Sequence, residues 1–198
     1  MQLEFGYRMA RHKLLTVAFL CYAVGAFAQK IDLSAGAKAE FDAIGKPAMI
    51  NIKGTGAKAQ GVLTVASGAA NGDFSLNLKS FTTDMDLRDE HMKEKYLEVD
   101  KPGHETAKVK IDQKVNVSEI PQNGIWEPKE LKGVLTLHGV TREVPITCRL
   151  TIKDYMASGV VSFKIKVQDF KIEIPSFAGV TMADEVDVKV FVNHKVLQ

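Results

Sequence analysis

The chain has 198 residues, of which 45% are hydrophobic and 25% are charged. This length and composition suit one globular domain with a sizeable core and exclude a disordered or collagen-like chain. Lysine and arginine together number 26 and aspartate and glutamate 24, which gives a formal net charge of +2. Such an even balance lacks the basic surface that non-specific nucleic-acid binding requires, so no nucleic-acid partner is expected.

The first 28 residues differ from the rest and predict a cleaved signal peptide. Arg8, Arg11 and Lys13 precede an uncharged stretch from 14 to 28, which closes on the small-x-small sequence Ala26-Phe27-Ala28. The alternative is a membrane anchor, but this stretch falls short of the roughly 20 apolar residues that span a bilayer. We therefore expect an exported, periplasmic protein whose mature domain covers 29–198. Met1 and Met9 both remain candidate start sites.

The predicted mature domain is formally neutral and holds a single cysteine. Residues 29–198 contain 23 basic and 23 acidic side chains. With Cys148 alone, an internal disulfide is excluded, so stability must come from packing and backbone hydrogen bonds. Cys148 lies among alternating apolar residues, which indicates a buried small hydrophobic side chain.

Most of the mature chain has the pattern of β-strands. From 36 to 72 it is rich in glycine and alanine, which indicates short or closely packed strands. Farther on, apolar and polar residues alternate, as expected for strands with one buried face. The apolar positions are Phe74, Leu76 and Leu78; Ala107, Val109 and Ile111; Leu135 and Leu137; Ile146, Cys148, Leu150 and Ile152; Phe163, Ile165 and Val167; and Val186, Val188, Val190 and Val192. Turn sequences at 70–72, 121–124, 138–140 and 157–159 predict antiparallel neighbours.

One segment breaks this alternation and predicts a short helix over 86–97. It is composed of good helix formers, and Asp84 or Asp86 is the expected cap. We expect Leu87, Met92 and Tyr96 to pack on the barrel. About eight antiparallel strands with one short helix favour an all-β fold, either a closed barrel or a sandwich. A barrel of this size holds either its own side chains alone or one small ligand.

No catalytic or metal site is predicted. The run Asp89-Glu90-His91 has suitable residue types, but consecutive helical residues point in different directions. A structural role, in which Arg88 and Asp89 make ion pairs or cap backbone groups, is favoured. The mature histidines His91, His104, His138 and His194 are scattered, and neither a Cys-x-x-Cys nor a Gly-x-Ser-x-Gly sequence is present. We therefore expect no cofactor and no enzymatic activity.

Several motifs carry a resemblance to a known family. They are Leu-Arg-Asp-Glu-His-Met at 87–92, Tyr-Leu-Glu-Val-Asp-Lys-Pro at 96–102, Leu-Lys-Gly-Val-Leu-Thr-Leu-His-Gly-Val-Thr-Arg-Glu-Val at 131–144, Asp-Phe-Lys-Ile at 169–172 and the closing strand at 184–188. In these motifs the chain resembles the YceI family. The resemblance implies a lipocalin-like barrel of eight antiparallel strands, whose lumen binds a long isoprenoid or related amphipathic lipid, commonly in the periplasm.

The resemblance assigns the family-motif positions, whereas the lumen candidates are drawn from the alternating apolar positions. The family-motif positions are Arg88, Asp89, His91, Met92, Gly139, Val140 and Thr141. The lumen candidates are Phe74, Leu76, Leu78, Val109, Ile111, Leu135, Leu137, Ile146, Leu150, Phe163 and Ile165. For a lipid head group, Arg88 and Arg142 are the candidate partners. The chain departs from the family where Lys101 replaces an aromatic residue before Pro102 and Val109 replaces a phenylalanine.

Three hypotheses follow for the function. The preferred one is a non-catalytic lipid-binding barrel, which allows transient contact with a membrane. The second is a barrel with a filled core that acts as a structural or partner-binding module. The third is a small enzyme that uses Asp89 or His91. The identity of the lipid, the choice between transport, storage and sensing, and the oligomeric state are left open.

Overall fold

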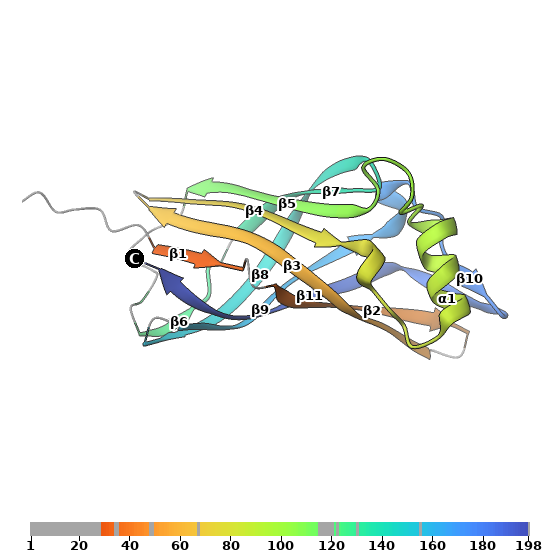
Figure 1. Ribbon diagram of the computed structural model, residues 1–198, viewed down its shortest axis with the longest axis horizontal. Coiled ribbons are helices and arrows are strands. Elements are labelled where there is room, and N and C mark those ends of the chain that lie inside the picture. Colours follow the sequence, from red (N-terminus) through yellow and green to blue (C-terminus); the bar gives the residue numbers. More distant parts are fainter. Residues whose placement is uncertain are drawn as a thin grey trace, which may run out of the picture.

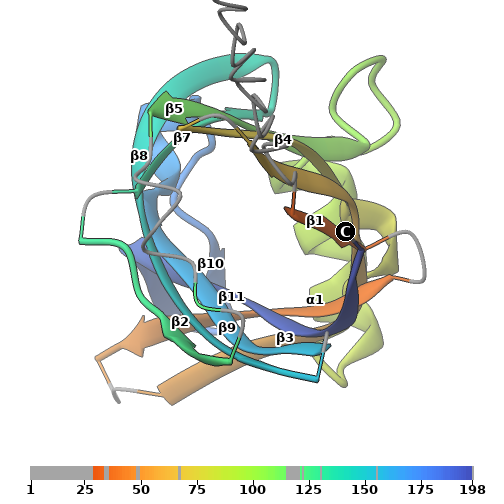
Figure 2. The same cartoon turned by 90° about the vertical axis from the view of Figure 1, so that its left-hand side faces the viewer.

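A computed structural model describes residues 29–33, 36–47, 50–66, 68–114, 121, 123–129, 131–154 and 156–197. The strands in these ranges form one antiparallel sheet that closes on itself (Figure 1, Figure 2). Eight strands make the ring in the order β2, β3, β4, β5, β7, β8, β9 and β11, and β11 pairs with both β9 and β2. The prediction of an all-β closed barrel is therefore confirmed, and the sandwich alternative is wrong.

The ring strands differ widely in length. They are β2 (Ala37–Lys46), β3 (Ile50–Ala66), β4 (Ala69–Asn77), β5 (Thr106–Lys114), β7 (Leu131–Leu137), β8 (Val140–Lys153), β9 (Met156–Lys166) and β11 (Val180–Leu197). Three short strands extend the sheet: β1 (Gln29–Asp32), β6 (Gly124–Trp126) and β10 (Ser176–Phe177). Since β1 pairs with β3 and β11, as β2 does, β1 and β2 act as one interrupted strand.

The predicted helix is present and covers one end of the barrel (Figure 1). Helix α1 (Asp86–Glu90) continues directly into a π-helical turn, η2 (His91–Tyr96). Two 3-10 turns, η1 (Leu78–Ser80) and η4 (Val167–Phe170), follow β4 and β9. In the described part of the chain, no helix is long and apolar enough to cross a bilayer. The predicted signal peptide lies outside the described residues.

Two details of the helix prediction are wrong. The residue at the N-cap is Met85, and no side chain caps the helix, so neither Asp84 nor Asp86 has that role. Leu87 does not pack on the barrel, because 51% of its surface is exposed. Tyr96 is buried as expected, and its hydroxyl donates to the carbonyl of Ser176 and accepts from the N–H of the same residue.

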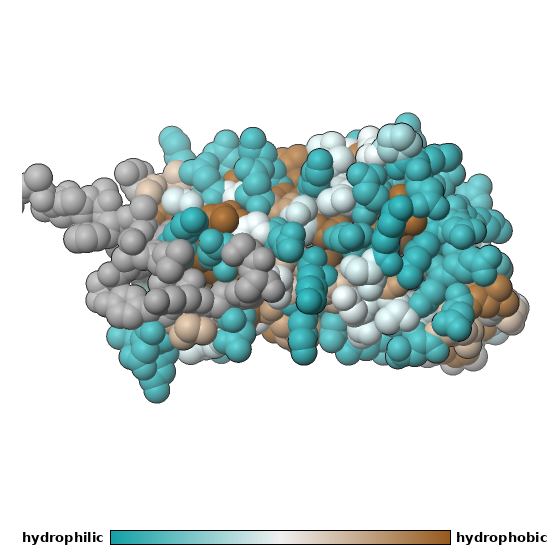
Figure 3. All heavy atoms as spheres, viewed as in Figure 1, coloured by the Kyte–Doolittle hydropathy of each residue, from teal (hydrophilic) through white to brown (hydrophobic). Residues whose placement is uncertain are grey.

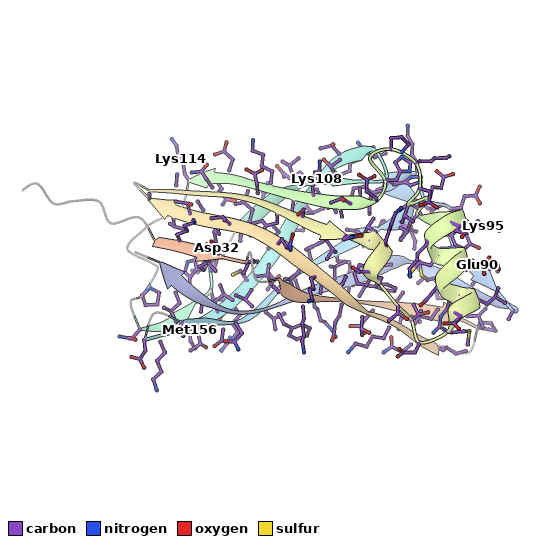
Figure 4. All side chains as sticks on the ribbon, in the orientation of Figure 1. Asp32, Glu90, Lys95, Lys108, Lys114 and Met156 are labelled. Atoms are coloured by element: carbon purple, nitrogen blue, oxygen red, sulfur yellow. The ribbon has the colours of Figure 1, made fainter. Side chains whose placement is uncertain are left out.

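Alternate side chains of each strand point into the barrel and form the core. On β8 the buried positions are Val144, Ile146, Cys148, Leu150 and Ile152, in strict period two. Charged side chains cover the outer face, as with Lys108 and Lys114 on β5 (Figure 4). Cys148 is buried and unpaired, as predicted. Its burial, together with the nearby carboxylate of Glu127, raises the pKa of the thiol to about 12, so the thiol is protonated at neutral pH.

Two of the predicted turns lie inside strands instead. Gly72 is part of β4, and a Cβ atom there would lie 2.6 Å from the ring of Phe74. Gly159 is part of β9, and a Cβ atom there would lie 2.1 Å from the carbonyl oxygen of Arg149. Both glycines therefore permit close approach within the sheet. The turn at His138 and Gly139 is confirmed, with both residues at positive φ.

The carboxylate of Asp89 fixes the helix to the chain that precedes it. It accepts hydrogen bonds from the Thr82 hydroxyl at 2.5 Å, the Thr83 hydroxyl at 2.5 Å and the Thr83 N–H at 2.7 Å. Thr82 is itself bridged to Thr55 of β3 through two backbone hydrogen bonds. Burial raises the pKa of Asp89, but the hydrogen bonds from Thr82 and Thr83, with nearby Lys93, outweigh it and hold the pKa below its usual value.

We predict that Asp89→Asn destabilises the protein by about 1–3 kcal/mol at neutral pH, because a charged acceptor of three hydrogen bonds is lost. Because the pKa of Asp89 is lower in the folded protein than in the unfolded chain, its carboxylate stabilises the folded protein at pH values above the unfolded pKa. This stabilisation is lost as the pH falls through the folded-state pKa. The gap between wild type and variant should therefore narrow in acid. Urea unfolding at neutral pH and near pH 3 measures both effects. Glu90→Gln, which removes an exposed neighbouring carboxylate (Figure 4), is the control; equal losses in the two variants would contradict the prediction.

Candidate functional site

The barrel interior contains two apolar cavities. The first, of about 130 Å³, lies at the end covered by the helix, and the second, of about 90 Å³, lies toward β1 and β6. Each volume is several times the roughly 10–15 Å³ that one water molecule needs. Apolar residues line both cavities, and the hydroxyl of Tyr96 in the first is already hydrogen-bonded to Ser176. A dry lining of this kind suits a hydrocarbon ligand.

All eleven lumen candidates line these two cavities. Those of the first are Leu76, Leu78, Leu135, Leu137, Phe163 and Ile165; those of the second are Phe74, Val109, Ile111, Ile146, Leu150 and again Phe163. Phe163 therefore lies between the two cavities. The placement of these side chains agrees with the alternation, whereas their contact with a ligand stays a prediction.

Strand β11 runs past both cavities and contributes lining residues to each. Met182 lines the first cavity, Val186 and Val188 follow it there, and Val190 and Val192 line the second. At about 3.3 Å per residue, this stretch of strand is roughly 33 Å long. The two cavities thus follow one another along the barrel, and a flexible chain that passes Phe163 reaches both.

A third cavity forms a mouth next to the helix. It has a volume of about 320 Å³ and shares Phe41, Met92, Tyr96, Pro175 and Met182 with the first cavity. Its other lining residues include Thr83, Arg88 and His91, so the mouth combines apolar and polar groups. An amphipathic molecule could place its head here and its tail in the barrel.

Arg88 is the cationic side chain of the mouth. Its Nε donates to the Thr83 hydroxyl at 2.8 Å, and its Nη2 donates to the Thr83 carbonyl. Among the described residues, Nη1 has no hydrogen-bond partner, so part of the guanidinium remains available to an anion.

Arg142, the other predicted head-group partner, is exposed on β8 and lines none of these cavities. For Arg142 that expectation is wrong.

The run Asp89-Glu90-His91 does not form a catalytic cluster. Asp89 is turned toward Thr82 and Thr83, Glu90 is exposed, and His91 lines the mouth. This divergence agrees with the expectation for consecutive helical residues. Of the remaining motif residues, Met92 lines the mouth and the first cavity.

The motif residues 139–141 belong to the β7–β8 hairpin rather than to the lumen. Gly139 occupies the turn at φ 72°, and Val140 packs against the core without lining a cavity. The Thr141 hydroxyl lies 2.9 Å from the hydroxyl of Thr136 across the two strands. Their role is to form the hairpin that carries Leu135 and Leu137.

Several lining residues were missed by the sequence reasoning. Phe41 lines the first cavity and the mouth, and its ring packs edge-on against Phe81 at 5.2 Å between centroids. A Cβ atom at Gly54 would collide with the Phe41 ring, so the glycine makes room for it. At the far end, Trp126 and Leu33 line the second cavity. Phe41 lies in the glycine- and alanine-rich stretch from 36 to 72, where the sequence indicated close packing but no individual lining residue.

Comparison with known proteins supports the same architecture. The family model for the YceI-like domain matches residues 31–193. No curated protein matches the chain. A polyisoprenoid-binding domain from Saccharophagus degradans is 16% identical, with a TM-score of 0.64 over 85% of this chain and 98% of that one.

Two further solved structures are similar. BcnA from Burkholderia cenocepacia is 17% identical, with a TM-score of 0.57 over 85% of this chain and 99% of that one. The YCEI protein of Campylobacter jejuni is 16% identical, with a TM-score of 0.54 over 75% and 87%. At these identities the structural likeness shows the fold alone. Membership of a family is shown by the YceI-like domain model, which matches residues 31–193: the chain belongs to the YceI-like domain family.

Proposed function

We propose that the barrel binds a polyisoprenoid, or an amphipathic lipid of similar shape, with the tail in the two apolar cavities and the head at the mouth. The observation that carries this proposal is the succession of mouth, first cavity and second cavity along β11. A structural relative is described as a polyisoprenoid-binding domain, which supports the same ligand class.

The apolar lining favours a long tail over a short one. Burial of each CH₂ group contributes about 0.8 kcal/mol, so one five-carbon unit contributes about 4 kcal/mol. Association itself costs an estimated 4–15 kcal/mol. Two or more units are therefore needed before binding is tight, and a ligand that fills both cavities should bind more tightly than one confined to the first.

Two observations distinguish this proposal from a filled-core barrel and from an enzyme built on Asp89. A structural or partner-binding barrel with a filled core predicts solid packing, whereas this interior leaves space on both sides of Phe163. An enzyme built on Asp89 needs an accessible carboxylate, whereas that of Asp89 is buried and hydrogen-bonded to two threonines. We therefore propose a non-catalytic carrier that acts in the periplasm after export.

Exposed apolar side chains next to the mouth suggest how a lipid enters. Ile50 and Met85, which line the mouth, are 44% and 46% exposed, and Leu87 follows on α1 at 51%. Apolar surface is visible at this end of the molecule (Figure 3, lower right). We propose that this rim, formed by Ile50, Met85 and Leu87, contacts a membrane transiently while the lipid moves between bilayer and barrel.

The proposal predicts a co-purified lipid. Protein from cells that express the full chain should release a prenyl lipid on organic extraction, detected by mass spectrometry at a constant ratio to protein. The delipidated protein should then take up a long prenyl alcohol. Protein that carries no lipid and takes up none would contradict the proposal.

We predict that Phe163→Trp shortens the usable channel, because a larger ring between the cavities obstructs passage. Affinity for a long prenyl alcohol should fall at least tenfold, while affinity for a short one changes less than twofold. Displacement of a fluorescent lipid by prenyl alcohols of increasing length measures this. Phe191→Trp, at a half-exposed position of β11 that lines neither cavity, is the control. Equal losses at all chain lengths would indicate general damage instead.

For the rim we predict slower lipid transfer in Leu87→Glu, by tenfold or more, because a carboxylate opposes insertion into the bilayer. Transfer is measured with a fluorescent prenyl lipid in neutral vesicles, and the equilibrium affinity in detergent should change little, since Leu87 lines none of the three cavities. The matched control is Ile125→Glu, which alters an exposed apolar residue away from the mouth. Similar transfer rates in both variants would argue against the rim.

A further inference from the structure

A group of three metal-ligand side chains lies outside the lipid channel. Glu98 follows the helical segment, His104 lies in the loop before β5, and His138 lies in the β7–β8 turn. The loop between η2 and β5 runs beside the end of β7 (Figure 1). The two histidine rings are 4.2 Å apart between centroids, and one ligand atom from each of the three residues lies within 4.8 Å of the others.

The hydrogen bonds of His138 orient its ring. Its Nδ1 lies 3.1 Å from the carbonyl oxygen of Phe170, and since a carbonyl only accepts, Nδ1 carries the proton. The other nitrogen, Nε2, is thereby directed at the Oε2 atom of Glu98, at 3.0 Å. A metal-bound histidine usually has this arrangement, in which one ring nitrogen binds the ion while the other donates to a backbone carbonyl.

The Nδ1 atom of His104 is buried and, within the described part of the chain, has no hydrogen-bond partner. It lies 3.7 Å from the same Oε2 atom of Glu98, which is beyond hydrogen-bonding distance. A buried polar atom without a partner costs free energy, so its retention needs an explanation. An ion placed between the three residues would bind this nitrogen and supply the explanation.

We infer that Glu98, His104 and His138 form a binding site for a divalent transition-metal ion of the zinc class. Two imidazole nitrogens and one carboxylate oxygen are ordinary zinc ligands. With bonds of about 2.0–2.1 Å, ligand atoms in a tetrahedral site lie about 3.3 Å apart. The two distances to Oε2 of Glu98, 3.0 and 3.7 Å, bracket this value, so small side-chain movements suffice to admit the ion.

Neighbouring groups support the ligands. Lys101 donates from Nζ to Oε1 of Glu98 at 2.6 Å, which leaves Oε2 directed at the histidines. The backbone is left-handed at Glu98, with φ 48°, and at His138, with φ 50°. A side chain at Gly139 would lie 3.3 Å from His104, so the glycine leaves room for that ring. All three ligands remain partly exposed, so water can take the fourth position.

The ion would link segments that are distant in the sequence. Glu98 and His104 belong to the connection between helix and β5, whereas His138 is held to Phe170 of η4. Binding should therefore stabilise the end of the barrel that the helix covers. This inference is independent of the lipid, since none of the three residues lines a cavity of the channel.

The experiment is a Zn²⁺ titration of the full chain in competition with a chromophoric chelator. We expect one ion per chain at micromolar or lower free Zn²⁺, and at least tenfold weaker binding in Glu98→Gln, His104→Ala and His138→Gln. His194→Ala is the control, because this residue belongs to β11 at the opposite end of the barrel and its removal should leave the affinity unchanged.

Folding of each variant is checked by circular dichroism, and His138→Gln keeps a donor for the Phe170 carbonyl. Zn²⁺ should raise the thermal midpoint of the wild type and not that of His138→Gln. Co²⁺ in place of Zn²⁺ should give visible absorption bands that the variant lacks. No binding to folded wild type, or equal affinities in wild type and the three ligand variants, would overturn the inference.

Discussion

The closed ring of eight hydrogen-bonded strands is the constraint on which the other features depend. Once the ring is closed, the distance between opposite walls is fixed by the backbone, and each inward position must be filled by whatever side chain the alternation places there. On β2 and β3 these positions are largely alanines, namely Ala37, Ala39, Ala43, Ala57 and Ala59. Of these, Ala59 lines the second cavity, whereas the other four line neither cavity. The cavities are the space that the larger inward side chains of the ring leave unfilled.

The sequence was informative where strands alternate between large apolar and polar residues. On β4, β5, β7, β8 and β9, period two alone identified the inward side chains, and all eleven lumen candidates line a cavity. The signal was strong there because one face meets the core and the other meets water. The helix was recognised for the same reason, since its spacing breaks the alternation.

The N-terminal third could not be predicted with the same detail. Alanine and glycine carry little contrast in hydrophobicity, and the pairing of β2 with β3 shifts register between Ala39 and Phe41. The extra residue lies on β3, where the buried positions change parity between Gly54 and Ala57, so that a simple alternation fails there. The turns at 70–72 and 157–159 were misplaced because glycine serves both turns and close strand contacts, and the sequence alone does not separate the two.

The Glu98, His104 and His138 group illustrates a different limit. Forty residues separate Glu98 from His138, and the antiparallel pairing of β5 with β7 brings the loop before β5 beside the β7–β8 hairpin. The spacing of residues along the sequence does not show that these two segments are in contact. The histidines are scattered along the sequence, but the prediction that they are also scattered in space is wrong for His104 and His138, whose rings lie side by side.

The size of the inward side chains has a consequence for how such barrels diverge. The hydrogen-bonded ring depends on the backbone, whereas the free space depends on the side chains that line it. Exchange of Ala59, which lines the second cavity, for valine would reduce that cavity without altering the backbone pairing of the strands. The volume available to a ligand can therefore change between relatives while the fold stays the same. Relatives with 16–17% identity that keep the ring are free to differ in what, and how much, they enclose.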